Sequence, residues 1–393
     1  MPAKRSLQAV WLSCALLLLL RIAEHPRHAI GWDVFGYYLY LPATVIHDDV
    51  ALRDRAWLDT LMTTYQPSST LYQLVEGPDG SRVIKYSSGM ALLYAPFFLL
   101  AHTVAPLLGH AADGLSPPYV WILTYGCLLF ALSGLFVLRK VLLHYFSDSW
   151  TAGLLLLIVF GTNYLQLTAW DGTLLTHSAL FTLYAWLLLA TIRWHEGPAW
   201  RWALLIGASA GWITLIRPSE GVCILIPLLW ALPLKGRSMR SHFMHFFGAV
   251  VVFVCIAGLQ TLYWKQVTGQ WFFYSYDNPG EGFEFASPYW REFLFSFRKG
   301  WLLYTPVMVF ALIGLAFLWK RQRQAFWGIT VFLLLDLWVI SSWSCWWYAG
   351  GSFSSRSMVA AYPVLAIPLG FALQAILAKR WGRRSGGPLI AGF

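Results

Sequence analysis

Long apolar runs recur along the whole chain and are separated by short polar segments. Runs of about 20 residues are long enough, as helices, to cross the hydrocarbon core of a bilayer. Because the runs are continuously apolar and do not alternate with polar residues, a transmembrane β-barrel is disfavoured. The pattern predicts an all-α polytopic membrane protein with about ten transmembrane helices, at about 7–23, 118–138, 150–165, 175–192, 202–216, 219–233, 242–263, 300–319, 326–342 and 357–377.

The segment 87–108 is also apolar but contains Pro96 and Pro106. We interpret it as a broken helix that lies on, or dips into, the outer face of the membrane. If it crossed as well, the chain would have eleven spans.

Composition excludes the other broad classes. Hydrophobic residues make up 58% of the 393 positions and charged residues only 12%, whereas soluble domains carry about 25% charged residues. Four of the five cysteines lie inside apolar runs and no CxxC motif occurs. A disulfide framework or a thiolate metal site is therefore not expected.

The net charge of +10 is explained by topology, because basic residues favour cytoplasmic loops. With the N-terminus inside and 87–108 not crossing, the predicted inner segments hold 16 basic residues and only two acids, Asp148 and Glu196. Both termini are then cytoplasmic, and no nucleic acid is needed as a partner. The protein is predicted to be a single integral membrane domain, 1–393, of the inner or plasma membrane.

Two large regions are predicted on the periplasmic or extracytoplasmic face, a first outer loop at 24–117 with interfacial helices and a second outer loop at 264–299. The inner loops are short and carry no chemical signature. Any activity should therefore reside on the outer face.

The first outer loop holds two candidate site residues. Asp33 follows the first span, with Tyr37 one turn further on and Tyr38 next to it. Asp33 is either the N-cap of a following helix or a carboxylate base at the lip of a cavity. Lys85, before the interfacial segment, is either a snorkelling lysine or a phosphate contact.

Further ionisable residues lie near the predicted outer surface or within the membrane. Asp171 and His177 stand between the third and fourth spans, and are either solvated or capping residues or part of a site. Arg217 either pairs with Glu220 in the next short turn or faces an anionic headgroup, because charges at this depth are costly unless they are paired or liganded. Asp336, inside the ninth span, is a site candidate for the same reason.

The second outer loop combines acidic, aromatic and glycine residues, including Tyr276 and Glu284. Carboxylates bind sugar hydroxyls and aromatic rings stack on sugar rings, although any interfacial loop contains such residues. Arg298, Lys299 and Arg356 depart from the positive-inside pattern. Together with Lys85 and Arg217, these cations suggest an anionic lipid headgroup as ligand.

In chain order, these segments resemble the GT-C superfamily of polytopic glycosyltransferases, above all the bacterial branch around protein O-mannosyltransferases and aminoarabinose transferases. The resemblance covers most of the chain. It rests on short motifs, which are Asp33 with Tyr37-Tyr38, Lys85-Tyr86-Ser87-Ser88-Gly89, Asp171, Arg217-Pro218-Ser219 and Arg298-Lys299-Gly300.

The resemblance implies transfer of a sugar from a polyprenyl-phosphate donor to a lipid, glycan or protein acceptor, with inversion and with Asp33 as base. It implies that Lys85 binds the donor phosphate, and we add Arg217, Arg298, Lys299 and Arg356 to that group. Sugar or acceptor contacts are assigned to Tyr37, Tyr38, Asp171, His177, Tyr276 and Glu284. No acid stands next to Asp33, so the divalent metal of some relatives is not assigned here.

Two other functions remain open from the sequence. A flippase or transporter for lipid-linked sugars would require charged residues within the spans, and Asp336 is one. An O-antigen ligase or polymerase would share the chemistry on the outer face.

Overall fold

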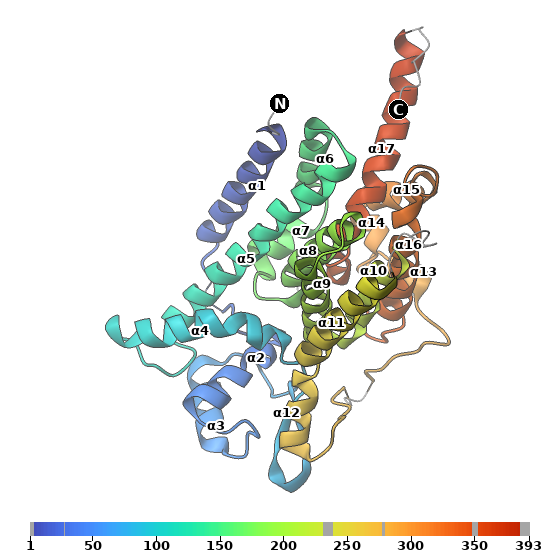
Figure 1. Cartoon of the computed structure of the whole chain (residues 1–393). Coiled ribbons are helices and arrows are strands. Elements are labelled where there is room, and N and C mark those ends of the chain that lie inside the picture. The colour runs from blue at the N-terminus through green and yellow to red at the C-terminus, as the bar shows by residue number, and fades with distance from the viewer. Residues whose placement is uncertain (1–3, 27, 231–238, 277–279, 348–352, 386–393) are drawn as a thin grey trace.

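The protein is mostly helical in the computed structural model, which describes residues 4–26, 28–230, 239–276, 280–347 and 353–385 (Figure 1). Within these residues, five helical segments are long and apolar enough to cross a membrane: α1 (Lys4–Ala23), α4 (Gly89–Leu107), α5 (Pro117–Tyr145), α16 (Arg323–Ser341) and the continuous stretch Phe243–Thr268. Several long apolar helices are what a membrane-embedded helical protein requires. The predicted number of ten spans stays a prediction.

The N-terminal part of the bundle contains α1, α5, α6 (Asp148–Phe160), α8 (Thr176–Glu196) and α9 (Trp200–Ile216). Between α6 and α8, the short α7 (Tyr164–Gln166) runs into a π-helical turn, η3 (Leu167–Asp171). The segment after α6 bends by 65° from the axis of α6. The predicted span at 150–165 is therefore bent near its end.

Two predicted spans are interrupted helices. Residues 218–229 form a 3-10 helix, η4 (Pro218–Ile224), followed by the short α10 (Leu225–Leu229). The predicted span at 300–319 is divided into α14 (Trp301–Tyr304) and α15 (Met308–Arg321) around Pro306. Apolarity alone did not reveal these interruptions, because a single proline changes the mean hydropathy of a span little, although it removes a backbone donor and disturbs the preceding turn.

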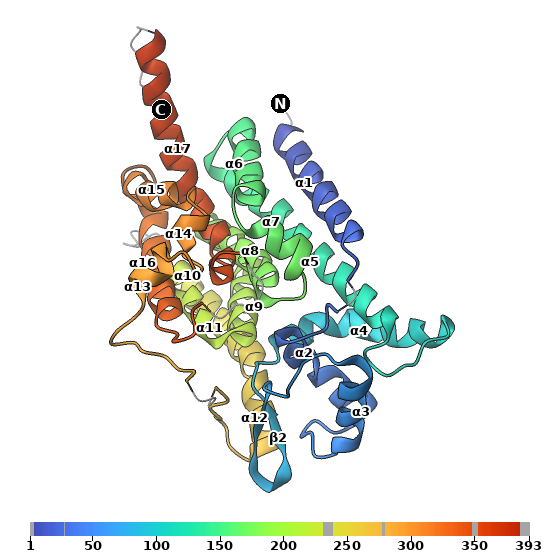
Figure 2. The ribbon, with the colours of Figure 1, turned by 180° about the vertical axis from the view of Figure 1, so that it is seen from behind.

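Helix α4 differs from its prediction in one respect. It continues through Pro96 and Pro106 without a break, so the predicted interruption is wrong. Figures 1 and 2 show that α4 lies crosswise to α1 and α5. Its packing helps to hold it, since Phe98 is fully buried and contacts Tyr119 at the start of α5 in a tilted arrangement, with ring centroids 5.4 Å apart.

The predicted first outer loop contains α2 (Asp33–Tyr38), a π turn, η1 (Pro42–Ile46), and α3 (Arg55–Tyr65). It also contains a β-hairpin that the all-α prediction lacks. Strand β1 (Leu74–Glu76) pairs antiparallel with β2 (Arg82–Ile84), and the turn between them includes the 3-10 segment η2 (Pro78–Gly80).

The C-terminal half completes the bundle. Helix α11 (Met239–Ala257) leads into α12 (Leu259–Thr268), which continues into the region predicted as the second outer loop. After α13 (Trp290–Phe295), α14, α15 and α16, a 3-10 turn, η5 (Arg356–Val359), precedes α17 (Tyr362–Ser385). Helix α17 packs along α15.

Contacts between helix ends define two ends of the bundle. At one end, the Asp148 carboxylate at the start of α6 accepts hydrogen bonds from the backbone N–H groups of Arg5 (2.8 Å) and Ser6 (3.0 Å). His144 of α5 lies 3.2 Å from Glu196 at the end of α8. At the other end lie the start of α8 and the end of α9, joined by Arg217 and His177.

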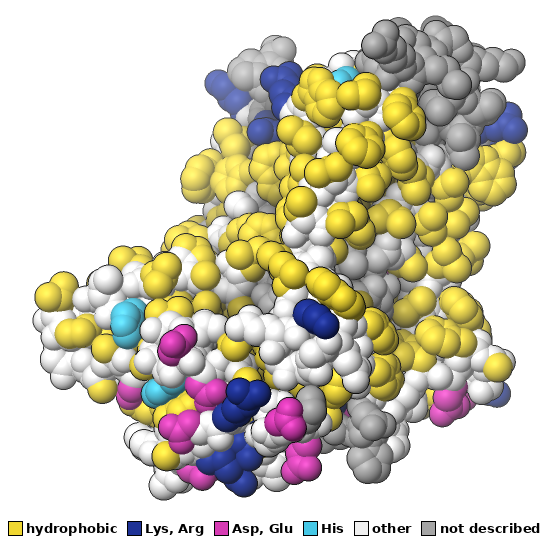
Figure 3. Space-filling model, turned by 60° about the horizontal axis from the view of Figure 1, so that its bottom comes forward, with side chains coloured by type: hydrophobic (Ala, Val, Ile, Leu, Met, Phe, Trp, Pro, Cys, Tyr) yellow, Lys and Arg dark blue, Asp and Glu magenta, His cyan; other side chains and the backbone are white. Residues whose placement is uncertain are grey.

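The 21 residues of α8 therefore separate the two ends by about 30 Å at 1.5 Å per residue. That length matches the hydrocarbon core of a bilayer. Figure 3 shows hydrophobic side chains over the flanks of the molecule, while acidic and basic side chains gather where its bottom comes forward. Exposed charged residues of the predicted first outer loop include Asp48, Arg53, Asp54, Arg55 and Asp59.

Candidate functional site

The Asp33 carboxylate is the centre of a polar cluster at one end of the bundle. The hydroxyls of Tyr72 and Tyr86 each donate a hydrogen bond of 2.8 Å to Oδ1 of Asp33. The Arg356 guanidinium donates from Nη2 to Oδ2 over 2.6 Å. The Asp33 side chain is 23% exposed, so it is largely shielded but not sealed inside the bundle.

Asp33 does not cap α2. It is the first residue of that helix, and Trp32 is at the N-cap position with no side-chain cap hydrogen bond. The capping alternative is therefore wrong. Trp32 has φ 53°, a left-handed conformation that is uncommon for a bulky residue and that clusters at functional sites. Ser354, two residues before Arg356, has φ 58°.

Electrostatics keep Asp33 ionised. Burial by itself would raise the pKa of Asp33, but the Arg356 charge and the hydrogen bonds from Tyr72, Arg356 and Tyr86 outweigh it and leave the pKa below its ordinary value. Conversely, burial and the nearby Asp33 charge raise the pKa of Tyr72 and of Tyr86. Both phenols therefore stay protonated and serve as donors to the carboxylate.

The segment that carries Lys85 and Tyr86 is fixed by contacts on several sides. Gln73 accepts the backbone N–H of Lys85 (2.8 Å), and Ser275 donates to the Lys85 carbonyl (2.7 Å). Tyr40 donates to the Tyr86 carbonyl (2.6 Å). These hydrogen bonds fix the backbone of Lys85 and Tyr86, and so the positions from which their side chains extend.

A close approach of backbones joins this segment to α9. A Cβ on Gly89 would lie 2.4 Å from the backbone nitrogen of Ile216, and the indole of Trp212 donates to the Gly89 carbonyl over 3.0 Å. Only glycine fits such a contact. The start of α4 is thereby held against the end of α9, next to Arg217.

Lys85 is buried and paired. Its side chain is 3% exposed, and its ammonium forms an ion pair with Glu281 of the predicted second outer loop, whose side chain is 22% exposed. The ammonium also lies over the ring of Tyr276, 5.0 Å from the centroid. The snorkelling alternative for Lys85 is therefore wrong, because a snorkelling lysine keeps its charge in water.

Arg217 makes the predicted pair and also faces the cluster. Its Nη1 lies 3.6 Å from the buried carboxylate of Glu220 and 3.5 Å from Nδ1 of His177. Tyr184 donates to the other oxygen of Glu220 over 2.7 Å. The charges of both Arg217 and Arg356 act on the buried Tyr37, so Arg217 is coupled electrostatically to the cluster around Asp33.

Of the remaining predicted cations, Lys299 is coupled to the cluster and Arg298 is not in described contact with it. Lys299 is coupled electrostatically to Arg356: burial is the larger cause of the lowered pKa of Lys299, and the Arg356 charge is the second. Arg298 instead stacks on Trp347, with the guanidinium carbon 3.4 Å from the ring centroid. Lys299 therefore belongs with the cluster, whereas the described contacts of Arg298 lie elsewhere.

Of the residues predicted to contact the sugar or acceptor, some lie in the cluster around Asp33 and others have partners elsewhere. Tyr37 packs on Tyr86 (ring centroids 4.5 Å apart), and Tyr276 approaches Tyr86 at 6.2 Å. Tyr38 turns away and donates to the Gly114 carbonyl, and the exposed Glu284 bonds to Tyr289. The side chain of Asp171 lies outside the described part of the structure.

The residues around Asp33 do not fit a metal ion. Within the described residues, no three His, Cys, Asp or Glu side chains gather in a way that could hold one. Both oxygens of Asp33 already accept bonds from tyrosine hydroxyls and a guanidinium. These groups are hydrogen-bond donors to the carboxylate, and the guanidinium is itself a cation.

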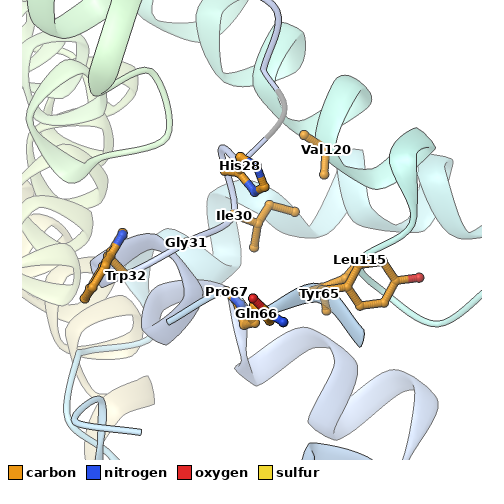
Figure 4. A pocket seen from close by; sticks show the side chains of 9 residues that line it. All are labelled: His28, Ile30, Gly31, Trp32, Tyr65, Gln66, Pro67, Leu115 and Val120. Atoms are coloured by element: carbon orange, nitrogen blue, oxygen red, sulfur yellow. The ribbon is translucent and has the colours of Figure 1, made fainter. Parts of the chain in front are cut away.

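A cavity of about 150 Å³ lies close to this cluster (Figure 4). It is lined by the segment before α2, the end of α3 and the start of α5. Trp32 is the lining residue adjacent to Asp33 in the chain. The full lining is His28, Ile30, Gly31, Trp32, Tyr65, Gln66, Pro67, Leu115 and Val120.

Sequence reasoning did not select Tyr72, Tyr86 or Glu281 as site residues. The chain has 19 tyrosines, and nothing in the local pattern distinguishes the two that bond to Asp33. Tyr86 stands in a segment that contributed to the family resemblance, and this is the only signal that pointed towards it. Comparisons with known proteins add no assignment, since no family profile matches the sequence and no characterised protein is significantly similar to it.

Proposed function

We propose that this chain is a membrane glycosyltransferase of the GT-C type. It transfers a sugar from a polyprenyl-phosphate donor to an acceptor hydroxyl on the extracytoplasmic face, with inversion and with Asp33 as base. The observation that carries the proposal is the ionised and partly exposed Asp33 carboxylate, surrounded by Tyr72, Tyr86 and Arg356.

The chemistry of the transfer matches the groups in the cluster. The leaving group is a phosphate, so it needs stabilisation of negative charge, which preorganised cations in a dry cleft supply. Arg356, Lys299 and Arg217 are the cations that we assign to this role. Lys85 supports the site indirectly, because its ion pair with Glu281 joins the two predicted outer loops.

The acceptor hydroxyl has to lose a proton as it attacks the anomeric carbon from the face opposite the phosphate. A positioned carboxylate within hydrogen-bond distance takes that proton. Two tyrosine hydroxyls on Oδ1 fix the orientation of Asp33. Tyr37 is buried against Tyr86, which leaves the partly exposed Tyr276 as the predicted aromatic residue that we assign to contact with the sugar.

The decisive experiment measures transfer of radiolabelled sugar from a panel of polyprenyl-phosphate donors by the purified protein. Asp33→Asn should reduce transfer by about 10²–10⁴-fold, the usual worth of a positioned general base, while the variant stays folded. Asp59→Asn is the matched control, because Asp59 is exposed on α3. Transfer by Asp33→Asn within a few fold of the parent would remove Asp33 as the base.

A transporter of lipid-linked sugars is the second candidate, and one observation favours it. Asp336 and Glu220 are each only 2% exposed, and buried acids within membrane segments mark ion or substrate paths. In proteoliposomes without acceptor, a transporter would move the lipid-linked sugar between leaflets. It would lose this activity in Asp336→Asn but keep it in Asp33→Asn, the opposite of what transfer requires.

A further inference from the structure

Two roles proposed above compete for the same atoms. Asp33 has to accept a proton, and Arg356 has to stabilise a phosphate, yet the two side chains are bonded to each other over 2.6 Å. Both are largely shielded, with 19% of the Arg356 side chain and 23% of the Asp33 side chain exposed. A carboxylate held in such a pair is a weak proton acceptor, because an opposite charge at this distance favours the ionised form.

The bonding pattern at Asp33 separates its two oxygens. Oδ1 accepts both tyrosine hydroxyls, whereas Oδ2 accepts the guanidinium. If Arg356 moves away, Tyr72 and Tyr86 still hold the carboxylate in place. Oδ2 then becomes the free oxygen, available to an incoming hydroxyl.

The proposed reaction moves negative charge away from Asp33. The bond between the anomeric carbon and the phosphate oxygen breaks, and its electron pair leaves with the phosphate. The acceptor oxygen bonds to the anomeric carbon, and its proton passes to the Asp33 carboxylate. Asp33 therefore loses one negative charge, while the phosphate passes from one negative charge as a diester to two as a monoester.

We propose that Arg356 exchanges partners when the donor binds, pairing with Asp33 in the empty site and with the donor phosphate in the loaded site. The exchange rests on the proposed function. It makes Asp33 a competent base only when a donor is present, and it brings the cation to the group that gains charge. Arg356 is thus a positioning residue for Asp33 and a binding residue for the phosphate.

Surrounding groups favour such an exchange. The charge of Arg356 also acts on Lys299 and Tyr37, so a phosphate near Lys299 lies within the same electrostatic field. Arg217 acts on Tyr37 as well. An anion near Arg356 is therefore also attracted by Lys299 and Arg217. In its absence, Arg356 is the one described cation that donates a hydrogen bond to Asp33.

The test is a binding cycle with farnesyl phosphate as probe and farnesol as the control without phosphate, using detergent-solubilised protein at fixed pH. The dissociation constant is measured for the parent, Asp33→Asn, Arg356→Gln and the double variant. Asp33→Asn frees Arg356, so it should bind farnesyl phosphate about tenfold or more tightly than the parent, the worth of one charged hydrogen bond. Arg356→Gln should bind about tenfold more weakly.

The double variant should bind like Arg356→Gln alone, because without Arg356 the loss of Asp33 frees nothing. Tyr72→Phe, which removes a hydrogen bond from Asp33 without changing its charge, should not tighten binding. If Asp33→Asn does not stay monodisperse on gel filtration, Asp33→Ser takes its place, since it also removes the charge. An Asp33→Asn or Asp33→Ser protein that binds no more tightly than the parent overturns the exchange alone. A parent protein that binds farnesyl phosphate no better than farnesol overturns the proposed function together with the exchange.

Discussion

Gly36 of α2 lies directly against the ring of Tyr86. A Cβ on Gly36 would lie 2.4 Å from Cδ2 of Tyr86 and 3.0 Å from Cβ of Gln73. Real Cβ atoms do not approach other atoms so closely. The ring of Tyr86 can therefore occupy this position only because residue 36 is a glycine. The hydroxyl of that tyrosine in turn donates to Asp33.

Gly36→Ala should displace Tyr86 and disturb Asp33. Helix propensity alone would favour alanine by up to about 1 kcal/mol, but overpacking of this kind costs about 1–3 kcal/mol. We expect a lower midpoint of thermal unfolding in detergent and at least a tenfold loss of sugar transfer. Gly153→Ala in α6 is the control, because a Cβ there meets nothing within 4 Å; equal effects of the two changes would refute the packing argument.

The Lys85–Glu281 pair should respond unequally to the loss of either partner. Glu281→Gln leaves the 3% exposed Lys85 without its carboxylate partner, and an uncompensated buried charge costs about 3–5 kcal/mol. Lys85→Met leaves Glu281, which is 22% exposed and keeps access to water. Unfolding midpoints should therefore fall further in Glu281→Gln than in Lys85→Met, and the reverse order would show that burial does not set the cost.

The acid limb of the pH profile should depend on Arg356. Because the folded-state pKa of Asp33 is lowered, its ionised form adds stability above the unfolded value of about 3.9, and this contribution disappears as pH falls through the lower folded value. In Arg356→Gln, burial is the strongest remaining influence and raises the Asp33 pKa. The fall in kcat/KM on acidification, which reports the free enzyme, should therefore begin at higher pH in Arg356→Gln than in the parent. Arg356→Lys should restore the parental profile in part, and identical profiles for parent and Arg356→Gln would argue against the pair in the free protein.

The predicted orientation can be tested with single cysteines in a background without the five native ones. Asp59→Cys and Glu284→Cys lie at exposed positions of the two regions predicted outside, and Glu196→Cys lies at an exposed position predicted inside. A membrane-impermeant maleimide applied to whole cells should label the first two and not the third. Labelling of Glu196→Cys alone would invert the topology. Labelling of all three only after lysis would show that none faces outward.

The membrane character of the chain was readable from its order of residues. Apolar runs such as that of α5 are local, contiguous features, and the energy of moving them into hydrocarbon depends on composition more than on neighbours. The same local reading failed at Pro96, where a helix was predicted to break and does not. It also missed the β-hairpin, because strands of three residues carry almost no periodic signal.

The residue types of the site were also within reach of the sequence. Asp33 and Lys85 are candidates from their positions beside the first span and the interfacial segment, and Lys299 and Arg356 because they depart from the positive-inside pattern. Arg217 is a candidate because a charge at its depth needs a partner or a ligand. That physical argument says a partner must exist, but it does not say which one.

The partners themselves were decided by the tertiary structure. Arg356 meets Asp33 across 323 positions of chain, and Lys85 meets Glu281 across 196. No local pattern in the sequence predicts contacts between residues so far apart in the chain. These contacts depend on the packing of α4 against α9 at Gly89 and of Tyr86 against Gly36. Sequence by itself thus determined that this is an apolar, helix-rich chain with charges that require pairing. Only the packing of distant helix ends decided that Asp33 stands between two tyrosines and an arginine, because side-chain pairing in a shielded site depends on three-dimensional proximity and on the exclusion of water.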